Sequence, residues 1–193
     1  MVLASGEYVT ANQYQYSDLF WALRGGGGGT YGVVVTVTYR THEEFPVTSI
    51  LFQINATTLE SALNVTAEYF KLQPSWSDAG WGGYSIFTAG PPGALQGLYL
   101  APNVSEAQVN ATLNPFLDNA RTATGAQNVA SFVTPIPTYY EWYLSFFNKT
   151  GQVGTNGELI SRLLSREAAE QQPDKVAEVV YNVTASLGTL EFK

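Results

Sequence analysis

The spacing of hydrophobic and polar positions between residues 47 and 133 predicts six elements, in the order strand, helix, strand, strand, helix, strand. The two middle strands flank the turn-forming sequence Gly-Pro-Pro-Gly and are expected to form a hairpin. This order predicts an α+β fold, with helices on one face of an antiparallel sheet and a ferredoxin-like βαββαβ core. The six segments are residues 47–53, 57–71, 81–87, 95–100, 105–117 and 126–133.

Two capping boxes mark where the helices of this core should begin. Thr57 and Glu60 are expected to open the first helix, and Ser105 and Gln108 the second, which Pro115 would interrupt or bend. A final helix is expected over residues 173–187. The expected buried positions are Leu59, Leu63, Ala67 and Phe70 in the first helix, and Val109, Leu113, Phe116 and Leu117 in the second.

The first 45 residues contain a run of five glycines between a predicted helix and a predicted strand. The helix covers residues 18–24, with Ser17 or Asp18 as its N-cap, and the β-branched strand covers residues 32–39. Five consecutive glycines are costly to order, so we expect a ligand to approach this backbone too closely for a Cβ atom. The alternative is that the glycines only let the helix and the strand pack closely.

Gly27, Gly29 and Gly32 formally complete a G-x-G-x-x-G motif. A dinucleotide-binding fingerprint needs a strand before the glycines and a helix after them, and here the order is reversed. No helix N-terminus is therefore offered to a pyrophosphate, and no Gly-Lys-Ser/Thr follows that would form a P-loop.

The stretch from Asp18 to Val35, DLFWALRGGGGGTYGVVV, resembles a segment of the vanillyl-alcohol oxidase and p-cresol methylhydroxylase (PCMH-type) flavoproteins, specifically their berberine-bridge-enzyme-like branch. The resemblance implies that residues 1–45 end an FAD-binding domain and that residues 46–193 form a substrate-binding α+β domain, incomplete at its C-terminus. The chain would then be an internal portion of a larger oxidase. By matching position, the residues implied to contact FAD are Gly28, Gly29, Gly32, Val33 and Val34.

In such flavoproteins the face of the sheet without helices lies over the flavin ring and lines the substrate cavity. The aromatic candidates on the two middle strands are Trp81, Tyr84 and Tyr99, with Phe87 beside them, although aromatic side chains in strands are more often core residues. Arg162 is a candidate anchor for a substrate carboxylate, and the alternative is that it pairs with a nearby glutamate.

The implied activity is oxidation of an alcohol, sugar or secondary metabolite by FAD, with O2 as the acceptor. No residue stands out as the catalytic base, and this chain alone is not expected to hold FAD tightly. An alternative is a non-enzymatic glycoprotein fragment that acts as a binding or interaction module. A further alternative is that the chain associates with the missing parts of the same oxidase.

The net charge and the scarcity of metal-binding residues argue against several other functions. The net charge is −7 and the basic residues are scattered, so neither nucleic acid nor a membrane is an expected partner. The chain has no cysteine and a single histidine, His42, so no metal site is expected. Its first residues lack the basic start and apolar core of a signal peptide, so we expect that the chain as given is not a nascent secreted protein.

About half of the asparagines lie in Asn-x-Ser/Thr sequons, far more than the Ser and Thr content predicts. We therefore expect a secreted, extracellular protein with N-linked glycans, although polar loops in any protein also collect these residues. The six candidate sites are Asn55, Asn64, Asn103, Asn110, Asn148 and Asn182.

Overall fold

The computed structural model describes residues 1–88, 90, 93–146, 161–187 and 189–192, the last strand by its backbone only. The chain divides into two compact units, Met1–Glu43 and Glu44–Lys193. Each unit is described by itself below.

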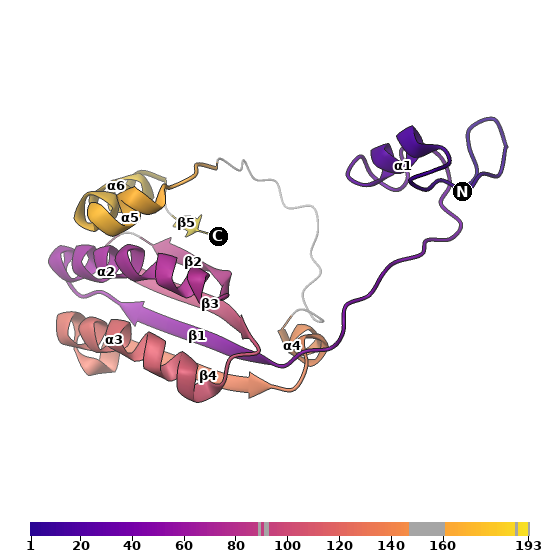
Figure 1. The fold of residues 1–193 in the computed structure, drawn as a ribbon. Helices are drawn as coiled ribbons and strands as arrows, with labels where there is room; N and C mark the ends of the chain where they lie inside the picture. The colour runs from indigo at the N-terminus through magenta and orange to yellow at the C-terminus, as the bar shows by residue number, and fades with distance from the viewer. Residues whose placement is uncertain (89, 91–92, 147–160, 188, 193) are drawn as a thin grey trace. The chain divides into compact units, whose positions relative to one another are not determined.

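The second unit is built on a five-stranded sheet in the order β4-β1-β3-β2-β5 (Figure 1). Every neighbouring pair is antiparallel. The first four strands and their two helices have the expected ferredoxin-like order, so the predicted fold class is confirmed. The strands are β1 (Val47–Asn55), β2 (Gly82–Thr88), β3 (Ala94–Pro102), β4 (Val129–Ile136) and β5 (Thr189–Phe192).

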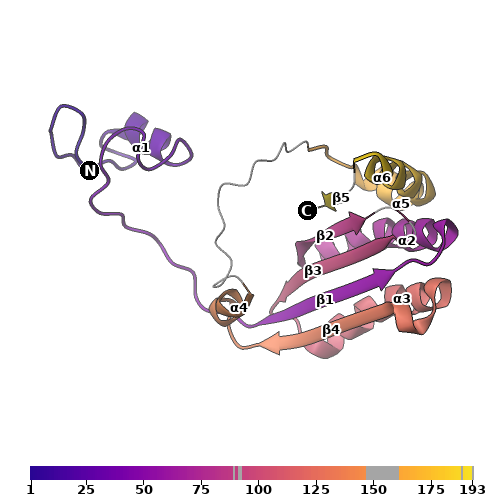
Figure 2. The same cartoon turned by 180° about the vertical axis from the view of Figure 1, so that it is seen from behind.

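Four helices cover one face of this sheet, and Figure 2 shows the opposite face turned toward the viewer. They are α2 (Leu59–Asp78), α3 (Glu106–Thr124), α5 (Arg166–Gln171) and α6 (Pro173–Leu187), the last with the expected bounds. A short 3-10 helix, η1 (Ala126–Asn128), precedes β4, so this strand begins three residues later than predicted. The aromatic helix α4 (Tyr139–Phe146) lies on the opposite face at one end of β1, where the indole Nε1 of Trp142 donates to Ser49 Oγ at 3.2 Å.

The cap of α2 differs from the prediction. Thr58, not Thr57, is the N-cap: its hydroxyl accepts from the Ser61 amide at 3.1 Å, and the Ser61 hydroxyl accepts from the Thr58 amide. The buried face also differs from the prediction: Leu59 is 53% exposed, and Val65 and Tyr69 lie in the core beside Ala67 and Phe70. The helix is also longer than predicted, since α2 continues to Asp78 through Pro74.

The cap of α3 agrees with the prediction. Ser105 and Gln108 form both hydrogen bonds of the capping box, and the four expected apolar positions are buried. The helix continues through Pro115, so the expected interruption is wrong, and the alternative of a bend stays a prediction. Pro115 lacks an amide hydrogen and removes one hydrogen bond of the helix, while the next two residues, Phe116 and Leu117, are buried.

The core between the sheet and the helices is dominated by aromatic rings. Phe52 of β1 lies within 6.2 Å, centroid to centroid, of the rings of Trp76, Tyr99 and Phe116. Gly97 on β3 makes room for this arrangement, because a Cβ atom there would overlap the Phe52 ring.

The first unit is small and has little regular structure. Its helix α1 (Ser17–Leu23) begins after Tyr16, which adopts a left-handed conformation and provides no side-chain cap, so the expected N-cap at Ser17 or Asp18 is wrong. The predicted strand over residues 32–39 is wrong as well: only Val33 forms a bridge, to Val2. No described segment pairs with residues 34–39, and a β-branched sequence forms a strand only where a neighbour accepts its hydrogen bonds.

Candidate functional site

The segment from Gly25 to Gly32 contains two kinds of glycine. Gly32 has a φ of +147°, and a Cβ atom there would strike the Val2 carbonyl, while Gly27 has a φ of +93°. These two are required by the fold of the unit itself. Gly28 and Gly29 have ordinary φ angles, and a Cβ atom on either would meet nothing within 4 Å. Nothing in the described chain therefore requires glycine at positions 28 and 29.

The two valines that follow are largely accessible. Val33 is 69% exposed, and its backbone amide and carbonyl are both bonded to Val2, at 2.9 and 2.8 Å. Val34 is also exposed, and its backbone forms no hydrogen bond with the described residues. A ligand above this loop would meet bare backbone at Gly28 and Gly29 and apolar side chains at Val33 and Val34. The proposed FAD contacts of all five residues stay a prediction.

The helix-free face of the sheet carries a shallow hollow of about 370 Å³, which we call the open-face hollow. The strand register orders its side chains into two rows that cross the sheet. It is lined by the side chains of Leu51, Gln53, Tyr84, Ile86, Gln96, Leu98, Ala130 and Phe132.

Of the aromatic candidates, only Tyr84 lies on this face. Trp81, Phe87 and Tyr99 are buried in the core under the helices, so their expected placement on the open face is wrong. Alternation puts residues 81 and 87 on the face opposite residue 84, and the helices cover the side with the larger aromatic surface. Neither Trp81 nor Tyr99 lines the open-face hollow, so a substrate held there would not touch these side chains.

Tyr99 belongs to a buried chain of hydroxyl groups. Its phenol shares hydrogen bonds with Tyr69 at 2.7 Å and with Ser85 at 3.0 Å. Burial raises the pKa of Tyr99, and burial raises the pKa of Tyr69 well above its ordinary value. Burial thus favours the neutral form of both phenols.

Arg162 is exposed in the segment that precedes α5. Its guanidinium forms no ion pair with the described residues, and neither of its two expected roles is tested. His42 is exposed as well.

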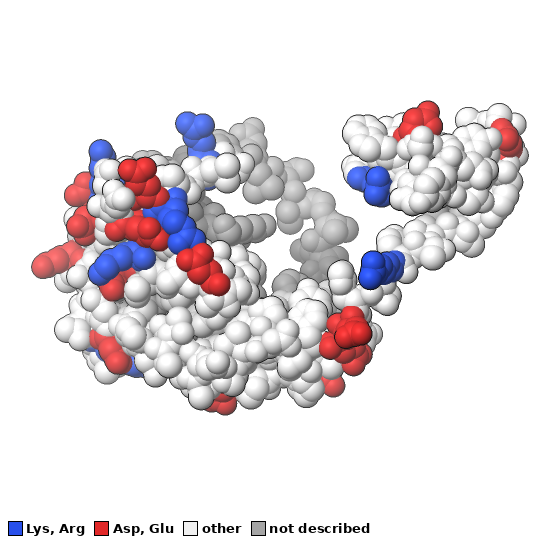
Figure 3. All heavy atoms as spheres, in the orientation of Figure 1, with Lys and Arg blue, Asp and Glu red and all other residues white. Residues whose placement is uncertain are grey.

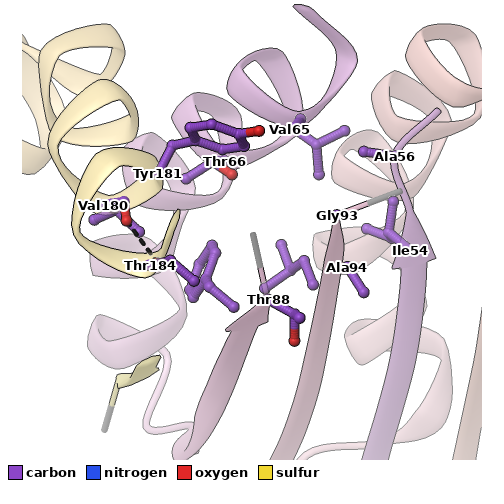
Figure 4. Close-up of a pocket in the computed structure, with 13 residues that line it drawn as sticks. Ile54, Ala56, Val65, Thr66, Thr88, Gly93, Ala94, Val180, Tyr181 and Thr184 are labelled. Atoms are coloured by element: carbon purple, nitrogen blue, oxygen red, sulfur yellow. Dashed lines mark hydrogen bonds between the residues drawn. The ribbon is translucent and has the colours of Figure 1, made fainter. Parts of the chain in front are cut away.

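A second, smaller gap lies between α2, α6 and the ends of β1, β2 and β3 (Figure 4). Its volume of about 30 Å³ holds no more than a water molecule. Val65 and Thr66 border it from α2, and Thr184 borders it from α6, where its hydroxyl donates to the Val180 carbonyl at 2.6 Å. This gap is a packing defect beneath α6 and is too small for a substrate.

The charged side chains of the second unit gather over the helical layer (Figure 3). Arg166 forms a bidentate pair with Asp78 and a further contact with Glu170, which ties α5 to the end of α2. Within the described ranges no group of three His, Cys, Asp or Glu side chains could hold a metal ion. No described helix is long and apolar enough to cross a membrane.

The sequons differ in accessibility. Asn64, Asn103 and Asn182 are exposed, whereas Asn55 and Asn110 are half-buried. Asn148 lies outside the described residues. Glycosylation and secretion stay predictions.

Sequence reasoning missed most of the open-face hollow. Gln53, Gln96 and Phe132 come from three different strands, and only the register across the sheet brings them together. Period-two alternation can indicate which residues share a face within one strand, but it contains no signal for cross-strand neighbours.

No model of a known protein family matches the chain. An uncharacterized FAD-linked oxidoreductase of Arthroderma benhamiae is 37% identical over 206 residues, which cover 100% of this chain and 34% of that protein. The FAD-linked oxidoreductase patO of Aspergillus clavatus is 30% identical, over 95% of this chain and 32% of its own length. The chain thus spans about a third of these relatives.

Solved structures give the same relationship. A VAO-type flavoprotein of Myceliophthora thermophila C1 superposes with a TM-score of 0.65 at 25% identity, over 94% of this chain and 34% of the flavoprotein. A second VAO-type flavoprotein of that fungus gives a TM-score of 0.64 over 95% of this chain. Sequence and fold agree along nearly the whole chain, and the chain therefore belongs, as a segment about a third of their length, to the family of FAD-linked oxidoreductases with the VAO-type flavoprotein fold.

Proposed function

We propose that this chain is part of a secreted FAD-dependent oxidase of the berberine-bridge-enzyme-like branch, which oxidises an alcohol, a sugar or another secondary metabolite and uses O2 as the acceptor. The first unit would contribute part of the FAD site, and the second would contribute one wall of the substrate cavity. When bound, FAD supplies the redox chemistry, accepting a hydride from a substrate carbon and passing two electrons to O2 to give hydrogen peroxide.

The observation that carries this proposal is the open space above Gly28 and Gly29. Neither a left-handed φ nor a neighbouring atom requires glycine there, and the resemblance of the surrounding stretch to a flavin-contacting segment makes FAD the partner that we propose for this bare backbone. A flat flavin lying on bare backbone needs this absence of Cβ atoms. Val33 and Val34 would then offer apolar contact beside it.

The role of this chain's own residues in catalysis is to bind, orient and exclude water. The open-face hollow offers a neutral wall of apolar and amide side chains against which a substrate can be held. Tyr69 and Tyr99 hold the wall rigid from behind through their shared hydrogen bond. No described residue is assigned the role of the catalytic base.

Isothermal titration of FAD into the complete oxidase tests the proposal, with Gly28→Val and Gly29→Val as the variants. Each added side chain occupies the space proposed for the flavin, so FAD affinity should fall by at least about tenfold, or about 1.4 kcal/mol. Gly82→Val is the matched control, since its Cβ atom also meets nothing within 4 Å and its φ is ordinary. Unchanged affinity in both loop variants would overturn the assignment of this loop to FAD.

A complete protein that is colourless and binds no FAD would instead favour the alternative of a non-enzymatic binding module. Secretion has its own test, since mass spectrometry of the protein from its native source reads each sequon directly. Glycans are expected at the exposed residues Asn64, Asn103 and Asn182. Finding every sequon unmodified would overturn the secretory part of the proposal.

A further inference from the structure

The open-face hollow has an ordered chemistry that restricts what can bind in it. Its first row across the sheet is Phe132, Leu51, Leu98 and Tyr84, and its second row is Ala130, Gln53, Gln96 and Ile86. The first row is apolar with an aromatic ring at each end. The second places two carboxamides side by side on adjacent strands.

No Asp, Glu, Lys, Arg or His is among the described residues that line this hollow, and the strand register places Glu191 of β5 opposite Ile86, one strand beyond the end of the second row. A charged ligand group held in the hollow would lose water without gaining an ion pair from these lining residues, which is costly. A neutral hydroxyl, carbonyl or amide would lose less water and could replace its hydrogen bonds with those of a carboxamide.

The two carboxamides have hydrogen-bonding capacity to spare. The Gln53 Nε2 donates to Asn55 Oδ1 at 3.2 Å, which orients this side chain and leaves its Oε1 free to accept. Gln96 makes no side-chain hydrogen bond within the described part of the chain, so both its amide hydrogens and its oxygen are available. The pair can thus both donate to and accept from one ligand group.

The apolar row supplies the complementary half of the site. Phe132 is 67% exposed, which is unusual for a phenylalanine on a strand whose other face packs in the core. With Tyr84 at the opposite end of the row, the two rings offer surfaces for a flat apolar body. A volume of about 370 Å³ lies within the range of small-molecule sites.

We propose that the open-face hollow selects uncharged ligands that join an aromatic or other apolar body to a neutral hydrogen-bonding group, and that Gln53 and Gln96 are the residues that set this preference. The inference rests on the proposed function in taking this ligand to be the substrate of the oxidase. The proposed substrates are then neutral molecules, and molecules that carry a carboxylate or an amine are not expected to be substrates.

A matched series of small probes tests the preference on the 193-residue chain labelled with ¹⁵N. Benzyl alcohol, benzoate and benzylammonium share a ring and differ in the charge of one group. Benzyl alcohol should bind with a Kd on the order of 10 mM, shift the side-chain amide signals of Gln53 and Gln96, and bind about tenfold more tightly than either ion. The amide signals are assigned with Gln53→Leu and Gln96→Leu.

Two variants separate a role in selection from a role in folding. Gln96→Glu puts a carboxylate into the amide row, so benzylammonium should gain about tenfold over benzoate. Gln171→Glu in α5 makes the same chemical change on an exposed helix and should leave the order of the probes unchanged. Phe132→Ala should weaken all three probes, with the circular dichroism spectrum unaltered because the ring is exposed.

Equal or tighter binding of benzoate or benzylammonium by the unaltered chain would overturn the inference. So would shifts confined to residues outside the hollow, or no binding of any probe. The measurement needs no flavin, so its failure leaves the proposed oxidase function standing. Conversely, a complete protein that binds no FAD would remove the proposed function without altering the order of the probes.

Discussion

At the scale of single residues, the structure separates side chains that the sequence presents as equivalent. Tyr84 and Tyr99 are both strand tyrosines, yet Tyr84 lines the open-face hollow and Tyr99 is hydrogen-bonded in the core. Gly28 and Gly97 are both glycines, yet only Gly97 has a neighbour that demands one. The difference is in each case which atoms lie opposite the residue, and that depends on elements far away in the chain.

Gly97→Ala should destabilise the second unit by about 1–3 kcal/mol, because the new methyl group overlaps the Phe52 ring and forces the aromatic core to shift. Urea unfolding followed by tryptophan fluorescence measures the change. Gly82→Ala, on a neighbouring strand and with open space at its Cβ, should cost less than about 1 kcal/mol. A Gly97→Ala protein as stable as this control would contradict the packing described for Phe52.

The buried phenols predict a loss of stability in alkali. The pKa values of Tyr69 and Tyr99 are raised by burial, so the folded chain keeps protons that the unfolded chain releases near pH 10. The free energy of unfolding should therefore be independent of these groups below about pH 9 and fall as the pH rises above about 10. Thermal unfolding between pH 8 and 11 measures this, and Tyr69→Phe should flatten the alkaline slope. An equally steep slope in that variant would be the contrary result.

At the scale of elements, the sequence predicted the βαββαβ core and helix α6 of the second unit, with less accurate ends, and it did not predict α4, α5 or β5. The pattern around Ser105 contains a complete capping box, and α3 begins there. Around Thr57 and Thr58 two adjacent residues can both cap a helix, and local chemistry does not choose between them. In the structure the capping box forms at Thr58, with Ser61 as its partner.

Thr58→Ala should cost about 1 kcal/mol, since it removes the hydroxyl that accepts from the Ser61 amide at 3.1 Å. Thr57→Ala is the control and should be nearly neutral, because Thr57 contributes only its backbone amide to the Ser61 hydroxyl. The melting temperatures of the two variants give the comparison. A larger loss in the Thr57 variant would place the helix start one residue earlier.

At the scale of the whole molecule, the second unit has a core of its own and the first does not. The described core cluster lies entirely between Ile50 and Val180, whereas residues 33–39 expose one valine after another. We expect residues 44–193 to fold alone, with a single cooperative transition. Expressing that fragment and comparing its melting temperature with that of the full chain is the test. A fragment without a cooperative transition would show that the first unit stabilises the second.

The sequence by itself determined the element order, the face of α3 that is buried and, through the stretch around the glycine run, the flavoprotein family. These properties depend on residues close together in the chain: periodicity, caps and a contiguous motif. Tertiary structure decided which face of the sheet stayed open, and it placed Gln53, Gln96, Tyr84 and Phe132 around one hollow. It also left residues 34–39 without a described partner. Cross-strand register and helix coverage depend on contacts between distant residues, and no local pattern encodes them.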